Sequence, residues 1–195
     1  MKRFTFAVCL ILALVGAGFA QDKSAQSTAV LDKMRQIDLL NHILPLALQK
    51  EQIRKILPVI EKARRDVRLW TDEEAKFLQQ NSAKVDKAVK DAVEKGDVPN
   101  KELIKELNAM VRMFAMKRAA IASDNTQMVM EAMKTSLNAG QMKVAANALD
   151  FKLYNPNIKP EEIKEEDRLR LYVQEVLLDP LAYDLLVRMQ SNKLG

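Results

Sequence analysis

The chain has 195 residues but only one cysteine and one histidine, and these two shortages exclude several kinds of site. Cys9 lies within the first twenty residues, which have the pattern of a secretory signal peptide. Without that segment the chain has no thiol, so neither a disulfide nor a cysteine-ligated metal is expected. His42 has no second imidazole or thiolate with which to complete a zinc site. We therefore predict no bound cofactor.

Glycine is also scarce, which argues against a sheet protein and against a phosphate-binding loop. Only Gly96, Gly140 and Gly195 follow the first twenty residues, and they are isolated from one another. Sheet proteins need more glycine in tight turns, and phosphate-binding loops need clustered glycines. Carboxylates are plentiful, but no spacing singles out a pair for glycosidase-type chemistry. With His42 as the one candidate base, we predict that the protein is not an enzyme.

Charge and aromatic content argue against nucleic acid as a partner. The formal net charge is +5, and loss of Lys2 and Arg3 with the signal segment lowers it by two to +3. The few aromatic residues do not interleave with basic clusters, as a platform for single-stranded nucleic acid requires. We expect no binding to nucleic acid.

The N-terminal segment predicts export. Residues 1–3 are a short basic start, residues 4–15 are an apolar run, and Gly18-Phe19-Ala20 supplies small residues before a polar stretch. The apolar run is shorter than the ~20 residues that a membrane-spanning helix needs. We predict a signal peptide at 1–20, a periplasmic or secreted working protein, and contact with the membrane only through the leader before its cleavage.

What remains is rich in strong helix formers, and its apolar residues recur at helical spacing. We predict an all-α fold: a single domain of about five to seven long amphipathic helices, some of them kinked. Residues 21–155 are expected to form the main helical domain, and 156–195 a C-terminal helical hairpin or extension. The first expected helix covers 29–44, with Val30, Met34, Ile37 and Leu40 or Asn41 along its apolar side. The others cover about 50–96 with a kink at Pro58 and a restart at Thr71, about 101–136, about 139–151, a stretch from Pro160, and a stretch from Pro180 capped by Asp179.

Two of these helix starts share a pattern of leucine, polar residue, two variable residues, glutamine and an apolar residue. If the polar residue is the N-cap, the leucine and the final apolar residue pack as a hydrophobic staple. The glutamine then falls at the third helical position and reaches back to the N–H of the cap residue. Asparagine is a good cap and glutamine a poor one, so the first copy is expected to have the weaker box. The two copies are Leu48, Gln49, Gln52, Ile53 and Leu137, Asn138, Gln141, Met142.

This arrangement resembles the LTxxQ motif of the Spy/CpxP family of periplasmic helical proteins, which carry it twice. The resemblance covers about 28–150, although the threonine of the family is Gln49 in one copy and Asn138 in the other. It implies an ATP-independent chaperone or an envelope-stress protein that binds unfolded or envelope proteins. Relatives form cradle-shaped homodimers with a basic, partly apolar concave surface. Here the candidate client-binding residues are Arg54, Lys55, Arg64 and Arg65, which could equally be a solvated helix face.

Two other interpretations remain open. The segment 156–195 has no counterpart in that family, which favours a structural or interaction module of the cell envelope with one specific partner. Met110, Met113 and Met116 place three thioethers within about a third of the helix circumference. Thioethers are ligands for Cu(I), so a soft-metal protein is a weaker alternative. Methionines at this spacing also serve as core or adaptable packing residues.

Overall fold

The structure is a computed structural model that describes residues 27–153, 159 and 162–191, and every regular element in these ranges is a helix. The all-α prediction is therefore confirmed, with six α-helices in one compact domain. The expected signal peptide at 1–20 lies outside the described residues, and so does the expected helix start at Pro160.

The elements follow one another in a simple order. The described part of the chain starts with a helix over 27–43 and a 3-10 turn, continues with two very long helices, and then has shorter ones. The remaining bounds are η1 (Leu44–Leu46), α2 (Lys50–Lys95), α3 (Lys101–Ser136), α4 (Ala139–Ala146), η2 (Phe151–Leu153), α5 (Glu165–Tyr172), the π-helix η4 (Val173–Leu177) and α6 (Pro180–Ser191).

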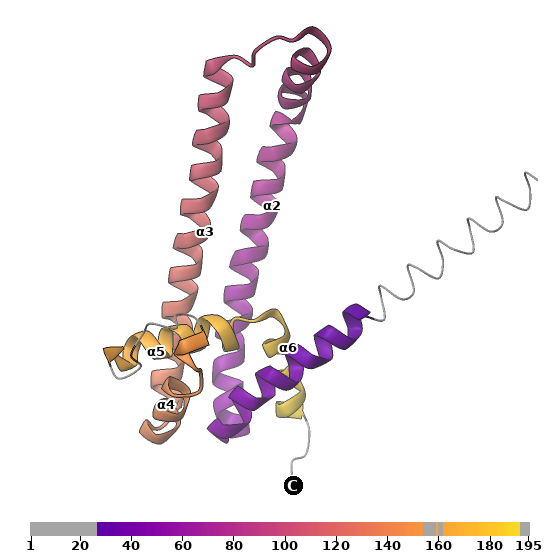
Figure 1. The fold of residues 1–195 in the computed structure, drawn as a ribbon. Coiled ribbons are helices and arrows are strands. Elements are labelled where there is room, and N and C mark those ends of the chain that lie inside the picture. The colour runs from indigo at the N-terminus through magenta and orange to yellow at the C-terminus, as the bar shows by residue number, and fades with distance from the viewer. Residues whose placement is uncertain (1–26, 154–158, 160–161, 192–195) are drawn as a thin grey trace, which may run out of the picture.

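The helices α2 and α3 run antiparallel and form a long hairpin (Figure 1). Gly96 ends α2 in the left-handed conformation at φ +73°, where its N–H bonds to the carbonyl of Ala92 at 3.1 Å. Glycine adopts this conformation without the steric cost that a Cβ imposes. Asn100 then caps α3, because its Oδ1 accepts the N–H of Glu102 at 2.7 Å. The observed bounds of α3 equal the predicted ones.

The predicted restart near Thr71 is wrong, since α2 is one continuous helix through both Pro58 and Thr71. The Thr71 hydroxyl donates to the carbonyl of Val67 at 2.9 Å, as a threonine inside a helix does, instead of capping a new one. Glu74, whose side chain would complete a capping box at Thr71, pairs instead with Arg118 across the hairpin at 3.4 Å. Pro58 is exposed, so the carbonyl that its missing N–H leaves free faces the solvent side of the helix.

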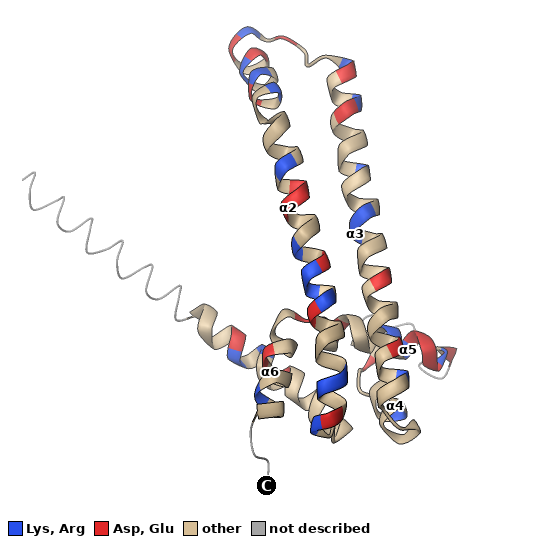
Figure 2. Cartoon of the chain, turned by 180° about the vertical axis from the view of Figure 1, so that it is seen from behind, with Lys and Arg blue, Asp and Glu red and all other residues tan. Residues whose placement is uncertain are grey.

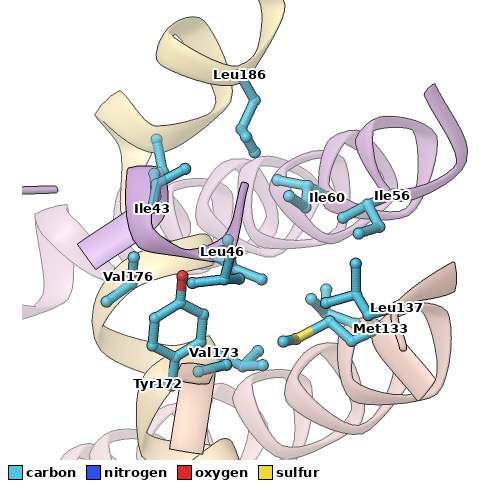
Figure 3. Close-up of a cluster of buried hydrophobic side chains, with 14 of the residues drawn as sticks. Ile43, Leu46, Ile56, Ile60, Met133, Leu137, Tyr172, Val173, Val176 and Leu186 are labelled. Carbon is cyan, nitrogen blue, oxygen red and sulfur yellow. The ribbon is translucent and has the colours of Figure 1, made fainter. Parts of the chain in front are cut away.

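The hydrophobic core lies at the base of the hairpin, below its long free part. The C-terminal end of the first helix, α4, α5, η4 and α6 all pack there against the lower turns of α2 and α3 (Figures 1 and 3). Tyr172 is fully buried in this core and its hydroxyl donates to the carbonyl of His42 at 3.2 Å. Burial raises the pKa of this phenol far above its usual value. The fully buried members include Ile43, Leu46, Ile60, Met133, Val173 and Leu186.

The C-terminal segment is part of this core and is tied to the first helix. Asp179 caps α6, because its Oδ1 accepts the N–H of Leu181 at 2.8 Å. Its other oxygen accepts from Nε of Arg35 at 2.6 Å, although the Asp179 side chain is almost fully buried. The chain on both sides of the undescribed 154–158 therefore contributes to one hydrophobic cluster.

The first helix differs from the sequence-based expectation in the side that it buries. Its body projects away from the base (Figure 1), and Leu39 with Ile43 makes the core contact. Most of the predicted apolar side is exposed instead, with Val30, Met34 and Ile37 between 52% and 61% exposed, and of the named residues Leu40 packs on the core. Periodicity identifies an apolar stripe on a helix, but it does not say whether anything covers it.

Candidate binding surface

The two helix-start motifs meet in space through their glutamines. Nε2 of Gln52 donates to Oε1 of Gln141 at 2.8 Å, and Nε2 of Gln141 donates back to Oε1 of Gln52 at 3.0 Å. Each amide nitrogen also donates to a backbone carbonyl just before the other motif, that of Ser136 and that of Leu46, both at 3.0 Å. Each amide oxygen accepts the N–H of its own cap residue. Both amides are thereby fully paired.

The caps themselves differ as the residue types suggest. Asn138 caps α4, with its Oδ1 accepting the N–H of Gln141 at 2.9 Å. At the start of α2 a capping box is also present, but the Gln49 side chain makes no cap hydrogen bond of ordinary geometry. The reverse half is well formed there, because Oε1 of Gln52 accepts the Gln49 N–H at 2.9 Å. The residues of the two staples, Leu48, Ile53, Leu137 and Met142, all belong to the core or pack on it.

The pairing between the motifs was not predicted, because 89 residues separate the two glutamines. The signal that could have found it is the repetition itself. The helix α2 begins and α3 ends at the same end of an antiparallel hairpin, so a helix that starts directly after α3 begins beside the start of α2. The glutamines at the third position of these two helices, Gln52 and Gln141, then lie within reach of each other.

The four basic residues predicted to contact clients do not form one surface. Arg64 packs over the ring of Tyr183 at 4.4 Å and lies 3.9 Å from a carboxylate oxygen of Asp184. Arg54 pairs with Glu51 on its own helix at 3.0 Å. Lys55 and Arg65 are exposed on the outer side of α2, away from the core. Arg64 thus contributes to the packing of α6, and the other three lie on a solvated face.

A groove lies where the hairpin emerges from the base. It has a volume of about 550 Å³ and its wall is mostly apolar. Two buried polar side chains fix its floor: Nδ2 of Asn125 donates to the carbonyl of Ala63 at 3.1 Å, and the Thr126 hydroxyl donates to the carbonyl of Ala122 at 2.7 Å. We call this the basal groove; it is lined by Ala63, Arg64, Val67, Arg68, Ala122, Asn125, Thr126, Gln174, Glu175, Leu178 and Pro180.

Above the basal groove the hairpin is a bare two-helix arm with a thin interface (Figure 1). Trp70, Phe77 and Phe114 form its aromatic contact, with ring centroids of neighbouring pairs 6.0 and 6.2 Å apart. Beyond them the two helices are joined by polar contacts, such as the ion pair of Lys84 with Glu106. Large apolar side chains remain uncovered along the arm.

Six apolar positions, five of them large, lie on the side of the arm that the basal groove faces. Val67 and Ala122 line the groove itself. A spacing of eleven residues is almost three whole turns, and one of eighteen is five, so the other four follow on the same side. We call this set the arm face: Val67, Leu78 and Val89 of α2, and Ile104, Val111 and Ala122 of α3. The five large members are 43% to 59% exposed.

Charged residues border the arm face along its outer edges, and on α2 they are of both signs, because Asp72 and Asp86 lie on the same edge as the basic residues. Arg68, Lys90, Lys105 and Arg112 directly follow Val67, Val89, Ile104 and Val111, and one residue is 100° of turn. Arg68 pairs with Glu61 at 2.7 Å, and this hydrogen bond, with the nearby arginines, holds the pKa of the Glu61 carboxyl below its usual value. The other three make no ion pair with any described residue. Figure 2 shows the basic and acidic residues distributed along both helices.

The methionines of the copper hypothesis are not arranged as one pocket. Met110 lies against α2, where its sulfur is 3.9 Å from Nδ2 of Asn81, while Met113 and Met116 are exposed. Within the described ranges, no group of three or more histidine, cysteine, aspartate or glutamate residues is placed to hold a metal ion. Nor does any described helix have the length and apolar character needed to cross a bilayer.

Comparison of the chain with protein-family models, with curated proteins and with solved structures finds no match.

Proposed function

We propose that the protein is an exported, non-enzymatic binding protein that holds unfolded or partly folded envelope proteins without ATP. The observation that carries this proposal is the arm face, a set of half-exposed apolar side chains on one side of both helices, with basic residues beside it on both of them. Large exposed apolar side chains that gather on one side of a protein, among polar ones, are typical of surfaces that bind other proteins. Positive charge beside it speeds encounter with acidic chains, and the apolar row holds them.

The architecture of the base supports the same proposal. The core and the paired glutamines fix the hairpin at one end, while the arm extends without a covering layer. A rigid base with an uncovered arm presents its binding surface without any rearrangement that a nucleotide would have to drive. The resemblance to the Spy/CpxP family, drawn from the two capping boxes, adds to this proposal.

The test is suppression of aggregation of a reduced, unfolding client by residues 21–195. We expect light scattering to fall as the protein approaches equimolar ratio. The double variant Leu78→Glu, Val111→Glu should lose most of this effect, because it places charge in the arm face. Met116→Glu is the matched control: it is 73% exposed and lies about 140° around α3 from Val111. Equal suppression by the double variant and the control would refute the assignment of the arm face.

A further inference from the structure

The basal groove has the size and the walls of a site for a small molecule. Its volume of about 550 Å³ lies within the range of about 300–1,000 Å³ that is usual for ligand pockets in proteins. Three elements converge on it, because α2 and α3 form two sides and the π-helix η4 with the turn after it forms the lower wall. Short π-helical segments are frequent at functional sites. The groove is thus a preformed hollow that a ligand can enter without rearrangement of the base.

On the floor of the groove, Asn125 is only 4% exposed and keeps one hydrogen-bonding atom unused. Its Nδ2 donates to the carbonyl of Ala63 at 3.1 Å, and this bond fixes which end of the amide is the oxygen. The Oδ1 accepts no hydrogen bond from any described residue, although an amide oxygen has two lone pairs for this purpose. A buried acceptor in an apolar groove is satisfied by a ligand that brings an N–H or O–H donor.

On the α2 side of the groove, Arg64 presents a guanidinium group whose N–H donors are also unused. Its side chain is held 4.4 Å over the ring of Tyr183 and is 27% exposed. The nearest carboxylate oxygens, on Glu61 at 3.7 Å and on Asp184 at 3.9 Å, lie beyond hydrogen-bonding distance. Glu61 is bonded to Arg68 instead, at 2.7 Å. Arg64 is therefore a positioned, half-buried cation without a hydrogen bond to any described residue, and a planar guanidinium is suited to binding a carboxylate.

The rest of the lining limits the charge and the character of the ligand. Glu175 is exposed on the wall that η4 forms, and it disfavours a second negative charge on the ligand. The other walls are apolar and include Val67, Ala122, Leu178 and Pro180. From this juxtaposition we infer that the basal groove binds a small amphipathic carboxylate: a molecule with an apolar body, one N–H or O–H donor for Asn125 and one carboxylate for Arg64. This site goes beyond the proposed function, because the holding of unfolded clients needs no such pocket.

Calorimetric titration of residues 21–195 with N-decanoylglycine, kept below the concentration at which it forms micelles, tests the inference. The core residues lie between 39 and 186, so removal of the leader leaves them in place. The probe has an apolar chain, one amide N–H and one carboxylate. N-decanoylglycinamide lacks the negative charge, and N-decanoylsarcosine lacks the N–H donor. We expect N-decanoylglycine to bind at least tenfold more tightly than either analogue, because each analogue leaves one polar group of the groove unpaired.

Two pairs of variants locate the site. Arg64→Gln should weaken binding of N-decanoylglycine at least tenfold and leave that of the uncharged amide unchanged, which would show that the groove is intact. Arg65→Gln, on the exposed outer side of α2, should change neither. Ala122→Trp fills the groove and should abolish binding of all three compounds. Ala120→Trp is its matched control on the opposite side of α3, where both alanines are exposed, and it should bind as the unsubstituted chain does. Equal thermal unfolding of the two tryptophan variants, followed by circular dichroism, shows that the loss is not one of folding.

The outcomes separate this inference from the proposed function. The inference is wrong if N-decanoylglycine does not bind, if it binds no better than its amide, or if its binding survives Ala122→Trp. It is also wrong if a short peptide that ends in leucine with a free carboxylate binds as tightly, since the groove would then hold the end of a client chain. In each of these cases, aggregation suppression that depends on Leu78 and Val111 would still support the arm face as a holding surface. If suppression is absent but the probe binds selectively, the proposed function fails and the protein is a carrier of a small amphipathic carboxylate.

Discussion

The base and the arm are built from the same two helices, yet they are stabilised in different ways. At the base, α2 and α3 are covered by the end of the first helix and by α4, α5, η4 and α6, and side chains such as Ile60 and Met133 are completely buried. In the arm the two helices have only each other, and Trp70 and Phe114 are its main buried contacts. The same helix therefore contributes to the core at one end and forms an exposed surface at the other.

The largest expected effect is the difference in unfolding free energy between truncating a large apolar side chain of α2 at the base and truncating one in the arm. Ile60→Ala should cost about 2–5 kcal/mol of unfolding free energy, since Ile60 is fully buried among core residues. Leu78→Ala, eighteen residues along the helix, should change it by less than about 0.5 kcal/mol, because Leu78 is half exposed. Denaturation followed by circular dichroism measures both. Similar costs would mean that the arm is covered by something.

The next largest effect is expected at the junction of the two motifs. Gln52→Ala and Gln141→Ala should each cost about 1–3 kcal/mol, since each leaves the partner amide and two backbone groups without their hydrogen bonds. The double variant should cost less than the sum of the two, because the second substitution removes a group that the first has already orphaned. A double-mutant cycle in urea gives the coupling, and strict additivity would contradict the reciprocal pair.

A smaller effect distinguishes the two caps. Asn138→Ala should cost about 1 kcal/mol through loss of the hydrogen bond to the Gln141 N–H. Gln49→Ser should be neutral or stabilising, because serine caps a helix better than glutamine does. Thermal unfolding of both variants tests this. Clear destabilisation by Gln49→Ser would show that Gln49 contributes something other than its role at the start of α2.

The smallest effect concerns the charges near the tip of the arm. Hydrogen bonds from Lys87 at 2.8 Å and Lys95 at 2.6 Å lower the pKa of Asp91 to about 2. A lowered carboxyl pKa stabilises the folded state at neutral pH, and that contribution is lost as the pH falls through about 2. At this exposed site the effect on stability should be slight. Titration by NMR should show the low pKa, and Lys87→Ala should raise it.

The sequence was sufficient for those parts of the fold that depend on neighbouring residues. The bounds of α3 follow from Asn100 at its start and from Asn138, which caps the next helix, just after its end, and Asp179 before Pro180 marks the start of α6. The prediction of a helix restart at Thr71 was wrong, because a capping pattern competes with a helix that is already propagating. Thr71 bonds back to Val67 there, and the helix continues.

The candidate site was less predictable, because it depends on which helix faces are covered. Arg64 looked like part of a basic surface, but Tyr183 and Asp184 from the C-terminal segment occupy its side chain. Conversely, the stripe of Val67, Leu78 and Val89 has the spacing of a core row, and only the position of η4 and α6 leaves it open. Whether a helix face is buried depends on which other helices pack on it, and a local sequence pattern does not show this.

The reciprocal pair of Gln52 and Gln141 also has a mechanical consequence. It fixes α2 close to one end, and the tip of α2 at Lys95 lies about 65 Å further along at about 1.5 Å per residue. The hairpin is therefore held at its base only, by these hydrogen bonds and by the core around them. A tilt of about 5° at the base would displace the tip by about 6 Å over such a length. A contact that changes the angle of the hairpin at its base would therefore move the far end of the molecule.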